Sequence, residues 1–183
     1  STALANSFLE EKQFDQEQTY PLEVYFCNNC SLLQLIDVVS PETLFSRYAY
    51  FTSASSKTLP EHFVALAKDL ARHPQNKFIV EIGSNDGVML RTLKDSGIDI
   101  LGVEPAMNIA QVANELGLET INGFFSENMA HQIVEQRGNA DVVIANNVVA
   151  HIDNLAGLVR GVHHLLKEDG RFILEVHHVG DLI

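Results

Sequence analysis

Apolar positions after residue 57 follow two alternating spacings, and this alternation predicts a sheet covered by helices. Short apolar runs with the length of strands occur at 78–84, 99–105, 118–124, 141–149 and 171–177. Segments with apolar residues at helical spacing occur at 57–72, 88–97, 107–117, 126–138 and 154–170. Strands and helices that alternate through short connections predict a mainly parallel sheet with helices on both faces, the doubly wound α/β class.

The first 56 residues have a different pattern. YPLEVYFC (20–27) and SLLQLIDVV (31–39) predict two short strands around a CNNC turn. PETLFSRY (41–48) predicts a short helix, because proline suits the first helical turn. A segment this small does not bury a core by itself. We therefore expect a small N-terminal β-hairpin module at 1–56 and a main domain at 57–183.

Composition and charge are typical of a globular protein and exclude some functions. Of the 183 residues, 46% are hydrophobic and 20% are charged. The formal net charge of -12 argues against nucleic-acid binding, because affinity for a phosphate backbone depends on clustered Lys and Arg. No apolar run approaches the roughly 20 residues that span a bilayer, and the start of the chain lacks the features of a signal peptide. We expect a cytoplasmic protein that does not enter membranes.

The stretch FIVEIGSNDGVML (78–90) is the first candidate for chemistry. An apolar strand ends in a tight loop of small and polar residues, and a helix follows at once. In a doubly wound fold this loop lies where ligands bind, and glycine lets backbone amides and the helix N-terminus approach them closely. A tight turn that binds nothing is the alternative interpretation of this loop alone.

The next strand adds an acid at a fitting position. Glu104 stands where the dinucleotide-binding fingerprint has an acid that accepts hydrogen bonds from ribose hydroxyls. However, the loop is not Gly-x-Gly-x-x-Gly, and Asn85 and Asp86 occupy the place of a pyrophosphate. An additional carboxylate and amide suit an adenosine cofactor with an amino-acid end and a positive charge. These features favour S-adenosylmethionine over NAD.

Several motifs carry a family resemblance. VEIGSNDG, VEP and DVVIANNVVAHI resemble the first, second and fourth-strand motifs of class I S-adenosylmethionine-dependent methyltransferases, which have a Rossmann-like fold. TALANSFL, YPLEVYFCNNCSLLQL, YAYFTSAS, EIGSNDG, VEPAMNIA, NNVVAHI and EVHHVGDLI, in this order, are similar to the sugar C-methyltransferases with an N-terminal zinc-binding module. This resemblance runs nearly end to end. It implies C-methylation of a nucleotide-linked deoxy-keto-sugar through an enolate.

The resemblance also implies which residues contact the cofactor. The glycine loop would hold the methionine and sugar portions of the cofactor, and Glu104 would bind its ribose hydroxyls. Four residues would surround its adenine. Two asparagines would border its methionyl end and the reacting methyl group. Phenylalanines after a strand also pack in cores, and asparagines at strand ends also form turns. The residues implied are Glu81, Gly83, Asn85, Asp86, Gly87, Glu104, Pro105, Ala106, Phe124, Phe125, Asn146 and Asn147.

Methyl transfer to carbon requires a base, and a group that stabilises the oxyanion. His151 follows the fourth strand at the ligand edge, and the resemblance implies an active-site histidine there. His177 and His178 end the fifth strand at the same edge. The resemblance further implies an aromatic hydroxyl from the segment that contains Tyr48 and Tyr50, although a tyrosine there could instead pack the N-terminal module onto the main domain.

Cys27 and Cys30 form a single Cys-x-x-Cys pair, which suggests metal or redox chemistry in a chain without secretion features. The resemblance implies a structural zinc held by two such pairs, since a closed tetrahedral site needs four ligands. It places the other pair before residue 1, and a Tyr-His-Glu-His motif with the principal base after Ile183. We therefore expect this chain by itself to bind the cofactor poorly and not to turn over.

Two other functional classes stay open at this stage. One is an NAD-dependent oxidoreductase of the same fold class, which the loop chemistry disfavours. The other is a noncatalytic zinc-ribbon adaptor, suggested by CNNC alone. The sequence specifies neither the sugar, nor the carbon that is methylated, nor the oligomeric state.

Overall fold

The computed structural model describes residues 1–5, 8–178 and 180, so parts of the TALANSFL and EVHHVGDLI motifs lie outside the described residues. The chain divides into two compact units, Ser1–Tyr50 and Phe51–Ile183. The predicted domain boundary after residue 56 stays a prediction. Across the described residues, no helix has the length and apolar character needed to cross a bilayer. The cytoplasmic location also stays a prediction.

The first unit is made of short elements. Two small antiparallel pairs form, β1 with β2 and β3 with β4. None of the residues described in this unit is buried, in agreement with the expectation that this segment has no core of its own. The elements are β1 (Thr2–Ala3), η1 (Glu11–Gln16), β2 (Thr19–Tyr20), β3 (Val24–Phe26), β4 (Leu33–Leu35) and α1 (Pro41–Phe45).

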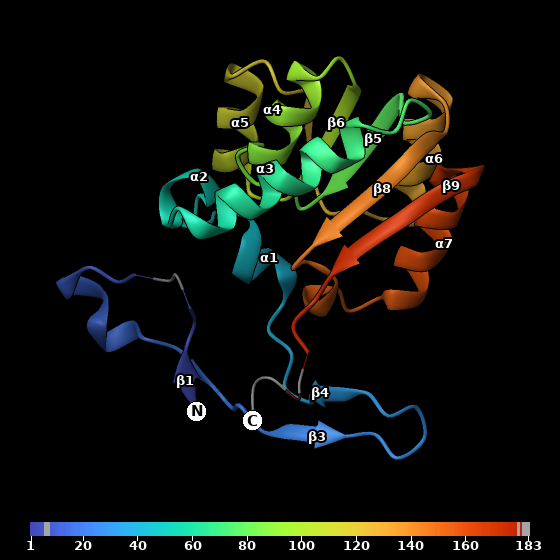
Figure 1. Ribbon diagram of the computed structural model, residues 1–183. Coiled ribbons are helices and arrows are strands. Elements are labelled where there is room, and N and C mark those ends of the chain that lie inside the picture. The colour runs from blue at the N-terminus through green and yellow to red at the C-terminus, as the bar shows by residue number, and fades with distance from the viewer. Residues whose placement is uncertain (6–7, 179, 181–183) are drawn as a thin grey trace. The chain divides into compact units, whose positions relative to one another are not determined.

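The second unit is a five-stranded parallel sheet between helices (Figure 1). The strand order is β7-β6-β5-β8-β9, and every neighbouring pair is parallel, so the predicted doubly wound class is confirmed. The elements are α2 (Thr52–Ser55), α3 (Thr58–Ala71), β5 (Phe78–Ile82), α4 (Val88–Asp95), β6 (Asp99–Glu104), α5 (Met107–Glu115), β7 (Thr120–Asn122), α6 (Glu127–Arg137), β8 (Ala140–Asn146), η2 (Val149–His151), α7 (Leu155–Leu165) and β9 (Leu166–Glu175).

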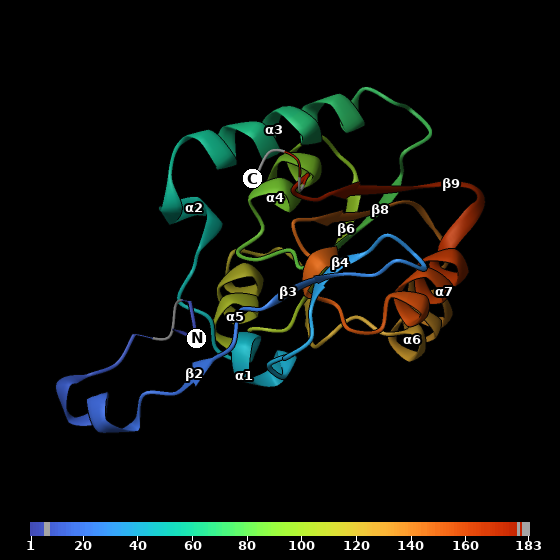
Figure 2. The ribbon, with the colours of Figure 1, turned by 90° about the horizontal axis from the view of Figure 1, so that it is seen from below.

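Two apolar layers join the helices to the sheet. Side chains of α3, α4 and α5 pack with Ile79 and Ile144 in one layer, and side chains of α6 and α7 pack with Val80 and Val143 in the other. Figure 2 shows α3 and α4 on one side of β8 and β9, and α6 and α7 on the other. Because alternate residues of a strand share a face, Glu81 lies on the face of Ile79, toward α4.

The predicted helix at 154–170 is wrong in its last turn. α7 ends at Leu165, and β9 begins at the next residue. The side-chain amide of Asn139 donates to the carbonyl oxygens of His164 at 2.9 Å and Leu166 at 3.2 Å. These are carbonyls that the end of a helix leaves without partners, so Asn139 stabilises the end of α7 at this point.

The predicted strand at 141–149 is also too long. β8 ends at Asn146, and residues Val149–His151 form the 3-10 turn η2. Asn147 has a φ of +56°, in the left-handed region that breaks a strand. Polar residues at this end of β8 therefore mark a turn and not the continuation of the strand.

Candidate functional site

Three polar side chains lie on three neighbouring strands at the carboxyl end of the sheet. Glu81 of β5 and Glu104 of β6 are each 5% exposed, and Asn146 of β8 is 8% exposed. By the alternation along each strand, all three lie on the face that α4 covers. The strand order changes direction between β5 and β8, which is where doubly wound folds bind ligands. The structure thus brings these predicted site residues to one edge.

The turn between β5 and α4 folds back over β6. The N–H groups of Gly83 and Ser84 both donate to the carbonyl oxygen of Val103, at 2.8 Å and 3.2 Å. Gly83 has a φ of +67°, and a Cβ at this position would lie 2.3 Å from a methyl carbon of Val148. Both the backbone conformation and the close approach therefore require glycine at position 83.

The carboxylate of Glu104 lies at the mouth of this turn. One oxygen accepts the N–H of Asn85 at 2.9 Å, and the other accepts the N–H of Ala106 at 2.8 Å. Burial raises the pKa of Glu104, and the two backbone hydrogen bonds oppose that shift. Glu104 thus lies beside the glycine turn, where the ribose of the cofactor is expected. Its contact with a ribose stays a prediction.

Glu81 and its neighbours form a cluster of buried acceptors. Burial first, then the charges of Glu104 and Asp86, raise the pKa of Glu81 to about 8. Four buried side-chain oxygens find no hydrogen-bond partner in the described part of the chain: Glu81 Oε2, Ser84 Oγ, Asp86 Oδ1 and Asn146 Oδ1. Buried polar atoms are normally paired, so this cluster indicates a ligand that brings hydrogen-bond donors or positive charge.

Helix α2 contacts the same turn, which the sequence reasoning missed. The N–H of Thr52 donates to Asn85 Oδ1 at 2.9 Å, and the N–H of Ser53 donates to Asp86 Oδ2 at 3.2 Å. The Ser53 hydroxyl donates to that same oxygen. One oxygen of Asp86 is thus held by α2 while the other stays unpaired and buried. In the sequence, only the TSAS segment of α2 could indicate this contact, and it stands next to the tyrosines considered for catalysis.

His151 lies in η2, at the end of the loop that follows β8. Burial lowers the pKa of His151, and the nearby His177 lowers it further. The neutral imidazole, which can accept a proton, is therefore favoured at neutral pH. The structure brings His151 and His177 together at the predicted edge of the sheet, and their catalytic roles stay predictions.

The residues predicted around adenine have mixed surroundings. The side-chain amide of Asn122 donates to the carbonyl oxygens of Glu104 and Pro105, each at 2.9 Å, and so fixes the chain after β6. Phe124 is exposed, whereas Phe125 packs in the second apolar layer beside Gly161 of α7. Phe125 thus has a packing role, and the predicted adenine contacts stay predictions.

The first unit holds the remaining predicted residues. The ring of Tyr48 lies 5.5 Å from that of Phe45 and 6.2 Å from that of Tyr50, between centroids. Their predicted part in catalysis stays a prediction. Hydrogen bonds from the backbone of Cys30 and Asn29 lower the pKa of Cys27, which favours the metal-binding thiolate. In the described residues, no group of three or more His, Cys, Asp or Glu side chains could hold a metal.

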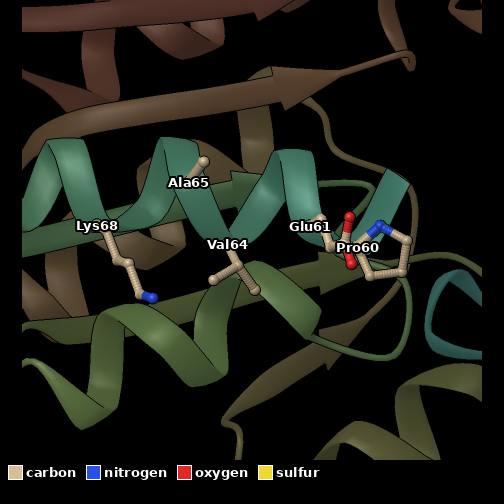
Figure 3. Close-up of a pocket in the computed structure, with 5 residues that line it drawn as sticks. All are labelled: Pro60, Glu61, Val64, Ala65 and Lys68. Carbon is tan, nitrogen blue, oxygen red and sulfur yellow. The ribbon is translucent and has the colours of Figure 1, made fainter. Parts of the chain in front are cut away.

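A separate depression lies on α3 (Figure 3). Its lining residues come from one helix and include none of the residues predicted for the site, so we do not assign the cofactor to it. They are Pro60, Glu61, Val64, Ala65 and Lys68.

Two protein families match parts of the chain. Residues 1–45 match the family described as "Putative zinc binding domain", and residues 57–182 match the family described as "Methyltransferase domain". The chain is 33% identical over 186 residues to the C-methyltransferase NovU of Streptomyces niveus, with 100% of this chain and 44% of NovU aligned. It thus spans less than half the length of that relative.

Solved structures resemble part of this chain. PH0226 from Pyrococcus horikoshii OT3 matches with a TM-score of 0.54 at 20% identity, over 72% of this chain and 60% of its own. The plantazolicin methyltransferase BpumL, solved with a pentazolic desmethylPZN analog and SAH, matches with a TM-score of 0.52 at 16% identity, over 64% of this chain and 48% of its own. These likenesses support the fold. Because the methyltransferase match covers well over half of the sequence, the chain belongs to the methyltransferase domain family.

Proposed function

We propose that this chain forms the S-adenosylmethionine-binding part of a C-methyltransferase. The observation that carries the proposal is the set of buried, unpaired acceptor oxygens beside the glycine turn, with the carboxylate of Glu104 at the mouth of that turn. Among the described residues, none of the ion pairs involves Glu81, Asp86 or Glu104. No basic side chain of the described residues therefore competes with a cationic ligand for these three acids.

The residues present fit this cofactor. S-adenosylmethionine carries a sulfonium, an ammonium group and two ribose hydroxyls. Glu81 and Asp86 offer buried carboxylate oxygens to the positive charges. A carboxylate has about four acceptor sites, and Glu104 uses two of them for backbone N–H groups, so two remain for the ribose hydroxyls. Gly83 has no side chain that would block the approach of the ligand.

The same oxygens disfavour a nicotinamide dinucleotide. A pyrophosphate binds at a helix N-terminus through backbone N–H groups. Here Asp86 Oδ1 is buried and unpaired one residue before Gly87, the N-cap of α4, so a phosphate would meet a carboxylate at short range. A noncatalytic adaptor is disfavoured because the methyltransferase match extends over residues 57–182.

The chemistry divides between the cofactor and the chain. When bound, S-adenosylmethionine supplies an electrophilic methyl group. The turn and Glu104 would bind and orient it. Neutral His151 is proposed to accept a proton from the carbon beside the substrate ketone, and Tyr48 or Tyr50 is proposed to donate a hydrogen bond to the resulting oxyanion.

The finer assignments also belong to this proposal. A nucleotide-linked deoxy-keto-sugar is the proposed substrate, supported by the motif resemblance and by the match of the whole chain to a C-methyltransferase. Cys27 and Cys30 are proposed as two ligands of a structural zinc, supported by the match of residues 1–45. Two thiols do not fill a closed tetrahedral site, so this pair by itself is expected to hold zinc weakly.

A thermal-shift competition tests the cofactor class. S-adenosylmethionine is expected to raise the melting temperature of the full-length protein with the logarithm of its concentration, because a ligand of the folded state at about 100 times its Kd adds about 2.7 kcal/mol of stability. NADH and ATP, which share the adenosine but carry phosphates, are expected to have no effect and serve as controls. A shift with NADH and none with S-adenosylmethionine would assign the site to an oxidoreductase.

A further inference from the structure

We propose that Glu175, held by His62, is a positioning residue that fixes the loop after β8 beside the glycine turn. This inference rests on the proposed function, since the loop borders the cofactor site assigned above. Neither residue was among those predicted for the site. The two come from α3 and β9, which are far apart in the sequence.

Glu175 makes three contacts at the end of β9. Its carbonyl oxygen accepts the N–H of Asn147 at 2.7 Å, and its Oε1 accepts the side-chain amide of Asn147 at 2.9 Å. Its Oε2 lies 2.6 Å from Nε2 of His62. Each oxygen of Glu175 thus has a defined partner, and the carboxylate joins α3 to the loop after β8.

We call the two hydrogen bonds from Asn147 to Glu175 the clamp, and the conformation of Asn147 explains why the clamp is needed. With a φ of +56°, Asn147 lies in the left-handed region, which residues other than glycine adopt when their surroundings hold them there. Its backbone N–H and its side-chain amide both donate to Glu175. Loss of the carboxylate removes the side-chain half of this clamp.

The clamped loop carries Val148, which covers the glycine turn, and His151, the candidate proton acceptor. Val148 follows Asn147, and its methyl carbon occupies the space that a Cβ on Gly83 would fill. The carbonyl oxygen of Val148 accepts the N–H of His151 at 2.9 Å. A change at Asn147 is therefore expected to move both the side chain that covers Gly83 and the candidate proton acceptor.

The contact between His62 and Glu175 contributes more to position than to stability. The side chains of His62 and Glu175 are 49% and 37% exposed, and ion pairs at this exposure stabilise proteins only slightly. Removing one partner should therefore leave the melting temperature nearly unchanged while it loosens the loop. This difference separates a positioning role from a merely structural one.

The test uses Glu175→Gln, which keeps the size of the side chain but removes its charge and one of its acceptor oxygens. Binding of S-adenosylhomocysteine to the full-length protein, measured by calorimetry, is expected to weaken about tenfold, the effect of one lost charge-assisted hydrogen bond. Glu168→Gln, at an exposed position of the same strand, is the matched control and should bind as the wild type does. Melting temperatures of all variants are measured in parallel.

A double-variant cycle with His62→Ala adds a second readout. If His62 acts through Glu175, the double variant is expected to bind no more weakly than Glu175→Gln alone. Wild-type affinity in Glu175→Gln, or a loss of affinity that follows an equal loss of stability, would overturn the positioning role while the proposed function stands. A full-length wild-type protein that fails to bind S-adenosylhomocysteine would overturn both.

Discussion

At the residue scale, the site depends on buried acids that have no basic partner in the described part of the chain. Glu81 shows this most clearly, because desolvation and two neighbouring carboxylates all favour its protonated form. A buried group that prefers to be neutral in the free protein can ionise when a cationic ligand arrives. The buried acids therefore link the stability of the free protein to pH.

The first prediction is that Glu81→Gln flattens this pH dependence. The pKa of Glu81 rises from 4.5 to about 8 on folding. Between these pH values the folded state holds a proton that the unfolded state has released, so the free energy of unfolding falls as pH rises through this range. Each pKa unit is worth about 1.4 kcal/mol. Urea unfolding of the ligand-free protein at several pH values between 5 and 8 measures the effect.

Glutamine at position 81 has no charge to bury, so the variant should lose less stability than the wild type between pH 5 and pH 8. Glu115→Gln, at an exposed position in α5, is the control and should follow the wild type. Parallel curves for the wild type and Glu81→Gln would mean that Glu81 is already ionised in the folded protein.

At the element scale, the strand β5, its turn and helix α4 are predictable from sequence because local patterns determine them. An apolar run, a glycine that must adopt a positive φ, and apolar residues at helical spacing all lie within FIVEIGSNDGVML. The end of α7 was not predictable in this way. It depends on the side chain of Asn139, which precedes β8 and reaches the helix from 25 residues away in sequence.

The second prediction compares two glycines, Gly83 at the start of the turn before α4 and Gly97 just after the end of α4. Gly83 and Gly97 both have positive φ, +67° and +80°, so alanine at either position is strained by about 1–2 kcal/mol. An added Cβ at Gly97 meets nothing within 4 Å, whereas at Gly83 it would lie 2.3 Å from Val148. Gly83→Ala should therefore cost about 1–3 kcal/mol more, from overpacking.

Urea unfolding of the two variants measures this difference. Combining Gly83→Ala with Val148→Ala should recover part of the loss, because the smaller side chain leaves room for the new Cβ. Equal destabilisation by Gly83→Ala and Gly97→Ala would show that Val148 does not cover the turn.

At the scale of the whole molecule, the alternation of strands and helices was enough to predict the doubly wound sheet, because the connections between these elements are short. Glu104 was predictable as well, since its spacing from the glycine turn brings it to a neighbouring strand. The residues that hold the turn and the neighbouring loop were not predictable from the sequence. Ser53 and His62 act through contacts with Asp86 and Glu175, 33 and 113 residues away, and such pairs leave no local pattern.

The central claim is that Glu104 and the glycine turn together bind S-adenosylmethionine. Calorimetry of S-adenosylmethionine binding to the full-length protein with Glu104→Ala tests it most directly, with Glu104→Gln as a variant that keeps the size of the side chain and Glu115→Ala as an exposed control. Loss of charge-assisted hydrogen bonds should weaken binding by about 1.4 kcal/mol or more, a tenfold or larger rise in Kd, and Glu115→Ala should have no effect. Unchanged affinity in both Glu104 variants would contradict the account.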